Sequence, residues 1–167
     1  MKFQDPKDTI CAISTPQGLG AISVIRVSGS NTFKIVGSIF SKDIKDVKSH
    51  QAVYGMIKND DVIVDDVLLT VFRNPSSFTG EDSVEIGCHG SPYIQSELLK
   101  LLTSKGARLA DPGEFSLRAF MNGKMDLSQT EAIADLIASR SKASHQMAMQ
   151  QMRGGFSKEI GELRQEL

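Results

Sequence analysis

Arg26 and Glu85 stand at positions where a charge can do chemistry. Arg26 is the single charge in an otherwise mostly apolar run over residues 21–27. An unpaired guanidinium in a largely buried strand is costly, so its partner is either an internal carboxylate or a ligand. Glu85 falls on the polar face of an alternating run, where a carboxylate accepts two adjacent hydrogen bonds or simply faces solvent. Lys124, taken alone, is typical of an exposed lysine in a turn.

Several common catalytic and nucleotide-binding patterns are missing from the sequence. The nearest fragment to a phosphate-binding P-loop is Gly-Lys-Met at residues 123–125, where the motif requires Ser or Thr after the lysine. The three histidines lie far apart and match no structural zinc spacing. Cys88 falls on the apolar face of its predicted strand and is interpreted as a small core residue. The sequence therefore predicts neither a nucleotide P-loop nor a metal centre.

Short β-type runs alternate with helical patterns up to about residue 118. Strands are predicted over residues 9–14, 21–27, 52–57, 62–72 and 83–88, the third and fourth forming a hairpin. One helix is expected after a cap at Ser30 or Asn31. Another begins at Ser91-Pro92 and ends before Gly106. This alternation predicts an α+β fold, a mixed β-sheet with helices, over residues 1–118.

Residues 119–167 have a different character, without proline or a β-rich run, and are predicted to be helical. Residues 128–131, Ser-Gln-Thr-Glu, fit a capping box. A helical stripe, with Gly154-Gly155 inside it, is formed by Met149, Met152, Phe156, Ile160, Leu163 and Leu167. An exposed stripe of this kind needs a partner. Either another chain covers it, or the sequence was cut from a longer protein.

Composition places the chain among ordinary globular proteins. Its 167 residues are 40% hydrophobic and 23% charged, which argues against intrinsic disorder. The net charge of −1 provides no basic field for direct binding of nucleic acid. There is no apolar run of about 18 residues and no signal-peptide pattern, so no membrane association is expected. With only two distant cysteines, the sequence predicts a cytoplasmic protein with reduced thiols.

Three segments concentrate unusual residues and carry a family resemblance. They are residues 15–29 (Thr-Pro-Gln-Gly-Leu-Gly-Ala, then Val-Ile-Arg-Val-Ser-Gly), residues 75–90 (Pro-Ser-Ser-Phe-Thr-Gly-Glu-Asp, then Val-Glu-Ile to His-Gly) and residues 112–127 (Pro-Gly-Glu-Phe-Ser to Asn-Gly-Lys-Met-Asp-Leu). In this order, and with the continuation over residues 129–137, they resemble the N-terminal part of the MnmE (TrmE) family of tRNA modification GTPases.

The resemblance implies a fold, a ligand and partners. Family members open with a domain similar to the folate-binding domain of glycine-cleavage aminomethyltransferases. That domain binds a reduced folate, such as 5-formyltetrahydrofolate or 5,10-methylenetetrahydrofolate, and forms a homodimer. A helical domain follows, interrupted by a G domain that uses GTP, Mg and K and is absent from this sequence. With the flavoprotein MnmG (GidA), the family modifies carbon 5 of the wobble uridine of tRNA with a folate one-carbon unit.

The same resemblance implies the site residues. It implies that Arg26, Glu85 and Lys124 contact the folate. The pterin edge presents two adjacent N–H donors, for which the carboxylate of Glu85 is a natural acceptor. The cations suit the glutamyl carboxylates and the oxygen of the one-carbon unit, without a fixed assignment of cation to group. No catalytic residue is expected in these 167 residues, and no GTP hydrolysis.

Two alternatives remain open from the sequence. The chain can be a structural dimerisation module whose ligand site is vestigial. It can also be a free-standing folate-dependent one-carbon transferase, although that activity would need its own catalytic carboxylate or thiol.

Overall fold

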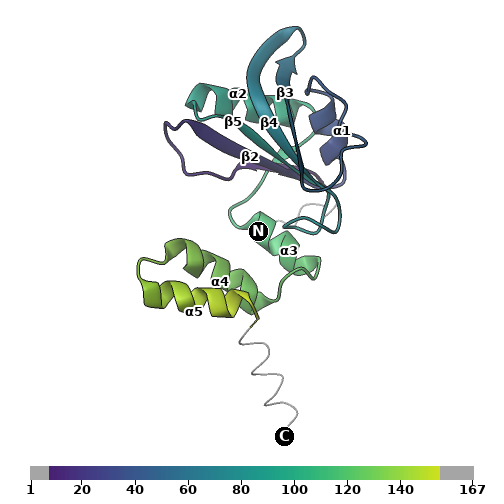
Figure 1. Cartoon of the computed structure of the whole chain (residues 1–167). Coiled ribbons are helices and arrows are strands. Elements are labelled where there is room, and N and C mark those ends of the chain that lie inside the picture. Colours follow the sequence, from purple (N-terminus) through teal and green to yellow (C-terminus); the bar gives the residue numbers. More distant parts are fainter. Residues whose placement is uncertain (1–7, 155–167) are drawn as a thin grey trace, which may run out of the picture. The chain divides into compact units, whose positions relative to one another are not determined.

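The computed structural model describes residues 8–154, which fall into two compact units. The first unit runs through Phe115 and the second begins at Ser116 (Figure 1). The first unit is a mixed β-sheet with helices, so the α+β prediction is confirmed. No helix between residues 8 and 154 combines the length and apolar character needed to cross a bilayer.

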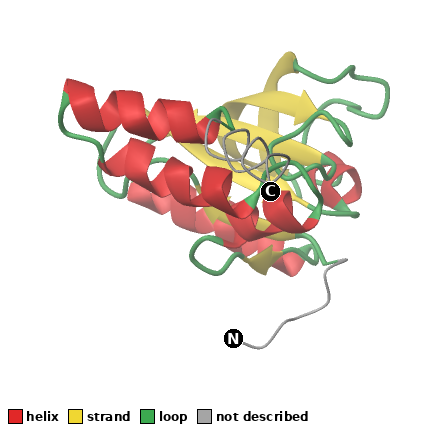
Figure 2. Ribbon diagram, turned by 90° about the horizontal axis from the view of Figure 1, so that it is seen from below, coloured by secondary structure: helices red, strands yellow, loops and turns green. Residues whose placement is uncertain are grey.

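Six strands form the sheet of the first unit, in the spatial order β3-β4-β5-β2-β1-β6. Figure 2 shows the strands in yellow. They span β1 (Ile10–Ile13), β2 (Ile22–Ser28), β3 (Gln51–Asn59), β4 (Val62–Phe72), β5 (Ser83–His89) and β6 (Arg108–Leu109). Neighbours are antiparallel except for the pair β1 and β6, which is parallel. The predicted strands and the predicted hairpin of β3 with β4 are confirmed.

One face of the sheet carries the hydrophobic core. Every second residue of a strand faces the core, because successive side chains of a strand point to opposite faces. Ile25, Leu69 and Ile86 are examples that are fully buried there. Helices α1 (Thr32–Gly37) and α2 (Pro92–Ser104) cover this face. The predicted apolar face of α2 is confirmed, since Leu98, Leu101 and Leu102 are buried.

The alternation along β5 is as predicted, and it leaves the opposite face polar. Val84, Ile86 and Cys88 are buried toward the core. The residues between them therefore project from the other face, Glu85 among them. This second face is the one that positions the candidate site.

The second unit contains α4 (Leu127–Ala138) and α5 (Lys142–Met152), which pack against each other. Helix α3 (Glu114–Met121) precedes them, and the boundary between the two units falls within its first turn. Two glutamine side chains tie the helical pair together. Gln129 donates to the carbonyl of Met152 at 3.0 Å, and Gln151 donates to the carbonyl of Ser128 at 3.3 Å.

Two predictions for this unit need correction. The capping box begins at Asp126, not at Ser128. The Asp126 carboxylate accepts from the backbone N–H of Gln129 at 2.8 Å, and the Gln129 side chain accepts from the N–H of Asp126 at 2.9 Å. A capping box needs a capping side chain followed three positions on by a side chain that reaches back to it. Asp126 and Gln129 meet this requirement two residues before the predicted start of the box.

Within the described residues, the predicted helical stripe is interrupted at Gly154. Helix α5 ends at Met152, and Gly154 has a positive φ of 80°, a left-handed conformation that commonly terminates helices. The members of the stripe from Phe156 onward lie outside the described residues.

Candidate functional site

Arg26 and Glu85 face each other across neighbouring strands. The antiparallel register of β2 with β5 places the two residues directly opposite. Both Nη2 and Nε of Arg26 donate to the same oxygen, Oε1 of Glu85, at 2.7 and 3.0 Å. Their side chains are 22% and 29% exposed. The internal-carboxylate alternative for the partner of Arg26 is therefore the one observed.

Two phenylalanine rings flank the guanidinium of Arg26. Its Cζ lies 4.9 Å from the centroid of the Phe78 ring and 5.4 Å from that of Phe115. These distances are within the range of cation–π attraction, which strengthens when water is partly excluded. Sequence reasoning assigned neither ring a role, although both lie in the segments that carry the family resemblance, in the β4–β5 loop and at the start of α3.

A cluster of hydroxyl groups anchors the loop that carries Phe78. The hydroxyl of Ser28 on β2 lies 2.7 Å from that of Thr79 and donates to the Glu81 carboxylate at 2.7 Å. The Ser83 hydroxyl donates to that of Ser28 at 2.9 Å. Between these residues, Gly80 adopts a positive φ of 76°, which glycine tolerates without steric cost. The cluster thus fixes the turn beside the ring that stacks on Arg26.

A shallow groove of about 440 Å³ opens on this face of the sheet. Glu85 and Gly87 line it from β5, and Leu68, Thr70 and Tyr54 line it from β4 and β3. Its other lining residues are Ala21, Ile22, Val24, Asp66, Val67, Cys88 and His89. The groove is apolar along much of its lining, with polar groups at a few points, a composition typical of small-molecule sites.

The carboxylate of Glu85 retains hydrogen-bonding capacity toward this groove. Both bonds from Arg26 end on Oε1, and within residues 8–154 the structure shows no hydrogen bond to Oε2. An ionised carboxylate has about four lone-pair sites, so Oε2 and part of Oε1 are available to a donor. Glu85 is thus an oriented acceptor, held by Arg26 and partly shielded from water.

Lys124, the third predicted site residue, lies in the second unit. It is exposed and follows α3, where its backbone N–H donates to the carbonyl of Ala119 at 2.9 Å. Gly123 just before it has a positive φ of 67°, which supports this turn. The structure brings Arg26 and Glu85 together, whereas the role of Lys124 stays a prediction.

The cysteines are core residues, as predicted for Cys88. Both Cys11 and Cys88 are buried free thiols. Burial raises the pKa of each thiol to about 11, because a thiolate is poorly stabilised without water. Neither thiol is therefore a nucleophile at neutral pH.

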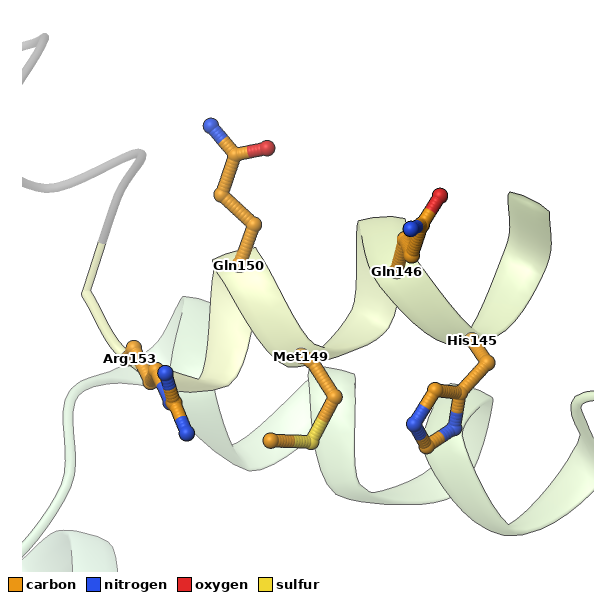
Figure 3. Close-up of a pocket in the computed structure, with 5 residues that line it drawn as sticks. All are labelled: His145, Gln146, Met149, Gln150 and Arg153. Carbon is orange, nitrogen blue, oxygen red and sulfur yellow. The ribbon is translucent and has the colours of Figure 1, made fainter. Parts of the chain in front are cut away.

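A second hollow, of about 470 Å³, lies on the helical unit and does not form a comparable site. Figure 3 shows its lining, which comes from α5 and its C-cap alone: His145, Gln146, Met149, Gln150 and Arg153. No second element contributes a side chain to this lining, so nothing converges on a ligand there.

Comparison with known proteins identifies the family of the chain. The family model described as "GTP-binding protein TrmE N-terminus" matches residues 9–124, a segment that contains all three predicted site residues. The tRNA modification GTPase MnmE of Flavobacterium johnsoniae is 54% identical over 165 residues, covering 96% of this chain and 35% of the relative. The proteins of the same name from Cytophaga hutchinsonii and Parabacteroides distasonis are 58% and 57% identical, covering 96% and 95% of this chain.

The chain spans about a third of the length of these curated relatives, 35% or 36% in each case. The match to the family's N-terminal model shows that this third is the N-terminal part of the relatives. The chain therefore belongs to the TrmE family, whose curated members are named tRNA modification GTPase MnmE, and corresponds to their N-terminal part.

Proposed function

We propose that this chain is the reduced-folate-binding and homodimerisation portion of a cytoplasmic tRNA modification GTPase. The observation that carries the proposal is the partly buried Glu85 carboxylate, oriented by Arg26, with an oxygen available beside a groove. A pterin presents a ring N–H and an exocyclic amine side by side, and a carboxylate accepts both at once. Charge-assisted, paired hydrogen bonds of this kind are the strong ones in ligand recognition.

The cations complete the proposed site. Arg26 orients Glu85 from the neighbouring strand β2. Lys124 is included as a second cation because the family resemblance implies it. Either charge suits the glutamyl carboxylates or the oxygen of the one-carbon unit, as in 5-formyltetrahydrofolate or 5,10-methylenetetrahydrofolate. Phe78 and Phe115 reduce the access of water to Arg26, which strengthens its electrostatic interactions.

The whole protein, in this proposal, modifies carbon 5 of the wobble uridine of tRNA together with the flavoprotein MnmG. The name of the curated relatives supports the tRNA modification role. These 167 residues contain no P-loop motif, so GTP, Mg and K would act through a part of the protein outside this sequence. We expect no GTP hydrolysis from the chain studied alone.

Calorimetric titration with 5-formyltetrahydrofolate tests the binding proposal. The unsubstituted chain should bind, and Glu85→Gln should weaken binding by roughly 10- to 150-fold, because one charged acceptor of a paired hydrogen bond is lost. Glu97→Gln is the matched control, since Glu97 lies on α2 and pairs with the exposed Lys100. Equal affinity of the Glu85→Gln and unsubstituted chains would contradict the assignment of Glu85.

Sedimentation velocity tests dimerisation in the same samples. A dimer that binds folate agrees with the proposal. A folded dimer without measurable folate affinity would instead support a structural dimerisation module with a vestigial site.

A further inference from the structure

His89 and Glu85 share one face of β5. They are four residues apart, and Gly87 lies between them on the same face. A strand rises about 3.3 Å per residue, so their Cα atoms are separated by roughly 13 Å. Both residues line the groove, Glu85 at one point and His89 at another.

Asp65 on β4 holds His89 through two hydrogen bonds. Its Oδ2 accepts from the backbone N–H of His89 at 2.8 Å, and its Oδ1 lies 2.7 Å from the ring Nδ1. The Asp65 side chain is 7% exposed, whereas the His89 side chain is 67% exposed. A buried carboxylate thus fixes the orientation of an imidazole that remains largely exposed.

The chemistry of Asp65 determines which ring nitrogen carries the proton. An ionised carboxylate only accepts hydrogen bonds, so Nδ1 must be the donor. In the neutral imidazole, Nε2 is then an unprotonated acceptor. Within residues 8–154, Nε2 makes no hydrogen bond. The arrangement presents an oriented acceptor whose partner is not supplied by the described part of the chain.

The other titratable groups lining the groove are two protonated groups, Tyr54 and Cys88, and two carboxylates, Glu85 and Asp66. Asp66 on β4 raises the pKa of the Tyr54 phenol on β3, chiefly through its charge, so Tyr54 stays protonated at neutral pH. Cys88 is buried, with its pKa raised to about 11, and is also protonated. Arg26 engages Glu85 at Oε1, and Oε2 of Glu85 is the carboxylate acceptor described above. Asp66 is a carboxylate on the neighbouring strand, beside the tyrosine that it perturbs.

We propose that His89, oriented by Asp65, is a ligand-binding residue of the groove. Its Nε2 accepts a hydrogen bond from an N–H or O–H group of the bound molecule. The inference rests on the proposed function, because it takes the bound molecule to be the reduced folate. It adds a neutral acceptor roughly 13 Å along the strand from the carboxylate that receives the pterin edge.

Asp65→Asn tests the inference through the tautomer of His89. One atom of the asparagine amide must still accept from the His89 backbone N–H, and its NH₂ then donates to Nδ1. The ring proton moves to Nε2, and the exposed acceptor becomes a donor. Nitrogen NMR of histidine-labelled protein reads this change directly, with His89→Gln identifying the His89 signals among those of the three histidines.

The expected results combine tautomer and affinity. The unsubstituted chain should show the Nδ1–H tautomer, and Asp65→Asn should show Nε2–H with about tenfold weaker binding of 5-formyltetrahydrofolate. His89→Phe should weaken binding similarly, while His89→Gln, which retains an acceptor, should recover part of the loss. His145→Phe, on α5, is the control and should bind normally.

The outcomes separate this inference from the proposed function. A reversed tautomer with unchanged folate affinity would overturn the role of His89 while leaving the Glu85 result intact. An Nε2–H tautomer in the unsubstituted chain would overturn it as well. Absence of folate binding by the unsubstituted chain would end both proposals. Backbone NMR spectra of each variant show whether the fold is retained, and His89→Phe supplies the affinity result if Asp65→Asn does not fold.

Discussion

Replacing Arg26 and Glu85 singly and together measures how strongly this pair stabilises the first unit. The variants are Arg26→Met, Glu85→Gln and the double substitution. Arg26→Met also removes the cation–π contacts with Phe78 and Phe115, but those contacts are lost equally in the double variant. They therefore cancel in the cycle, and the coupling energy reports on the ion pair itself.

The geometry sets the expected magnitude. Two donors reach one oxygen at 2.7 and 3.0 Å, and the side chains are 22% and 29% exposed. Fully exposed pairs contribute about 0.2–1 kcal/mol, whereas breaking a buried pair costs about 3–5 kcal/mol. A partly buried pair with two donors falls between these limits, so we expect a coupling free energy of about 1–2 kcal/mol.

Urea unfolding followed by tyrosine fluorescence is the assay. The chain has no tryptophan, and its two tyrosines, Tyr54 and Tyr93, both lie in the first unit, so the signal reports on that unit. With a denaturant dependence of about 2 kcal/mol per molar urea, the coupling corresponds to roughly 0.5–1 M in midpoint.

An exposed pair on α2 provides the comparison. Lys100 and Glu97 lie 2.9 Å apart, with side chains 71% and 31% exposed, and the same cycle there should give a smaller coupling because water screens the pair. If the coupling between Arg26 and Glu85 is no larger than in this pair, partial burial does not strengthen the interaction and the reasoning is refuted.

Three further predictions concern other parts of the chain. The pKa of about 11 for Cys11 and Cys88 implies that thiol labelling at pH 8 is at least about 100-fold slower than for an ordinary cysteine. The labelling rate should rise about tenfold per pH unit until the pH reaches the thiol pKa. Rapid labelling of the folded protein would contradict this prediction. Gly90→Ala places a Cβ 2.4 Å from the carbonyl oxygen of Gly20 and should lower the free energy of unfolding by about 1–3 kcal/mol, as measured by urea titration; unchanged stability would show that this backbone approach relaxes freely. Asp126→Ala removes the N-cap of α4 at a cost of about 1 kcal/mol, so amide exchange in the first turn should accelerate about fivefold, and unchanged exchange would show that the cap is dispensable.

Local sequence patterns predicted much of the first unit. The alternation along β5 identified which side chains are buried, because a strand with one face in a core must alternate. The charge of Arg26 within an apolar strand indicated a partner, because an uncompensated buried charge is costly. The motifs around Arg26, Glu85 and Lys124 identified the family, and the match over residues 9–124 confirms it.

Helix boundaries in the second unit were less accessible to the same reasoning. Asp126 and Ser128 both precede residues that suit a capping box, and the choice between them depends on where the helix axis must begin to pack on α5. Gly154 likewise gave no indication, by its type alone, of whether α5 bends there or ends. Packing contacts such as Gln129 with Met152 accompany the observed ends.

The amino-acid sequence alone determined that the sheet has one apolar and one polar face, and that Arg26 lies in a mostly apolar strand and needs a partner. Only the tertiary structure decided what that charge meets. Arg26 and Glu85 are 59 residues apart in sequence, and Asp65 and His89 are 24 apart, so their pairing depends on strand order and register. Register is set by how whole strands fit a common core, a property distributed over many residues and absent from any local motif.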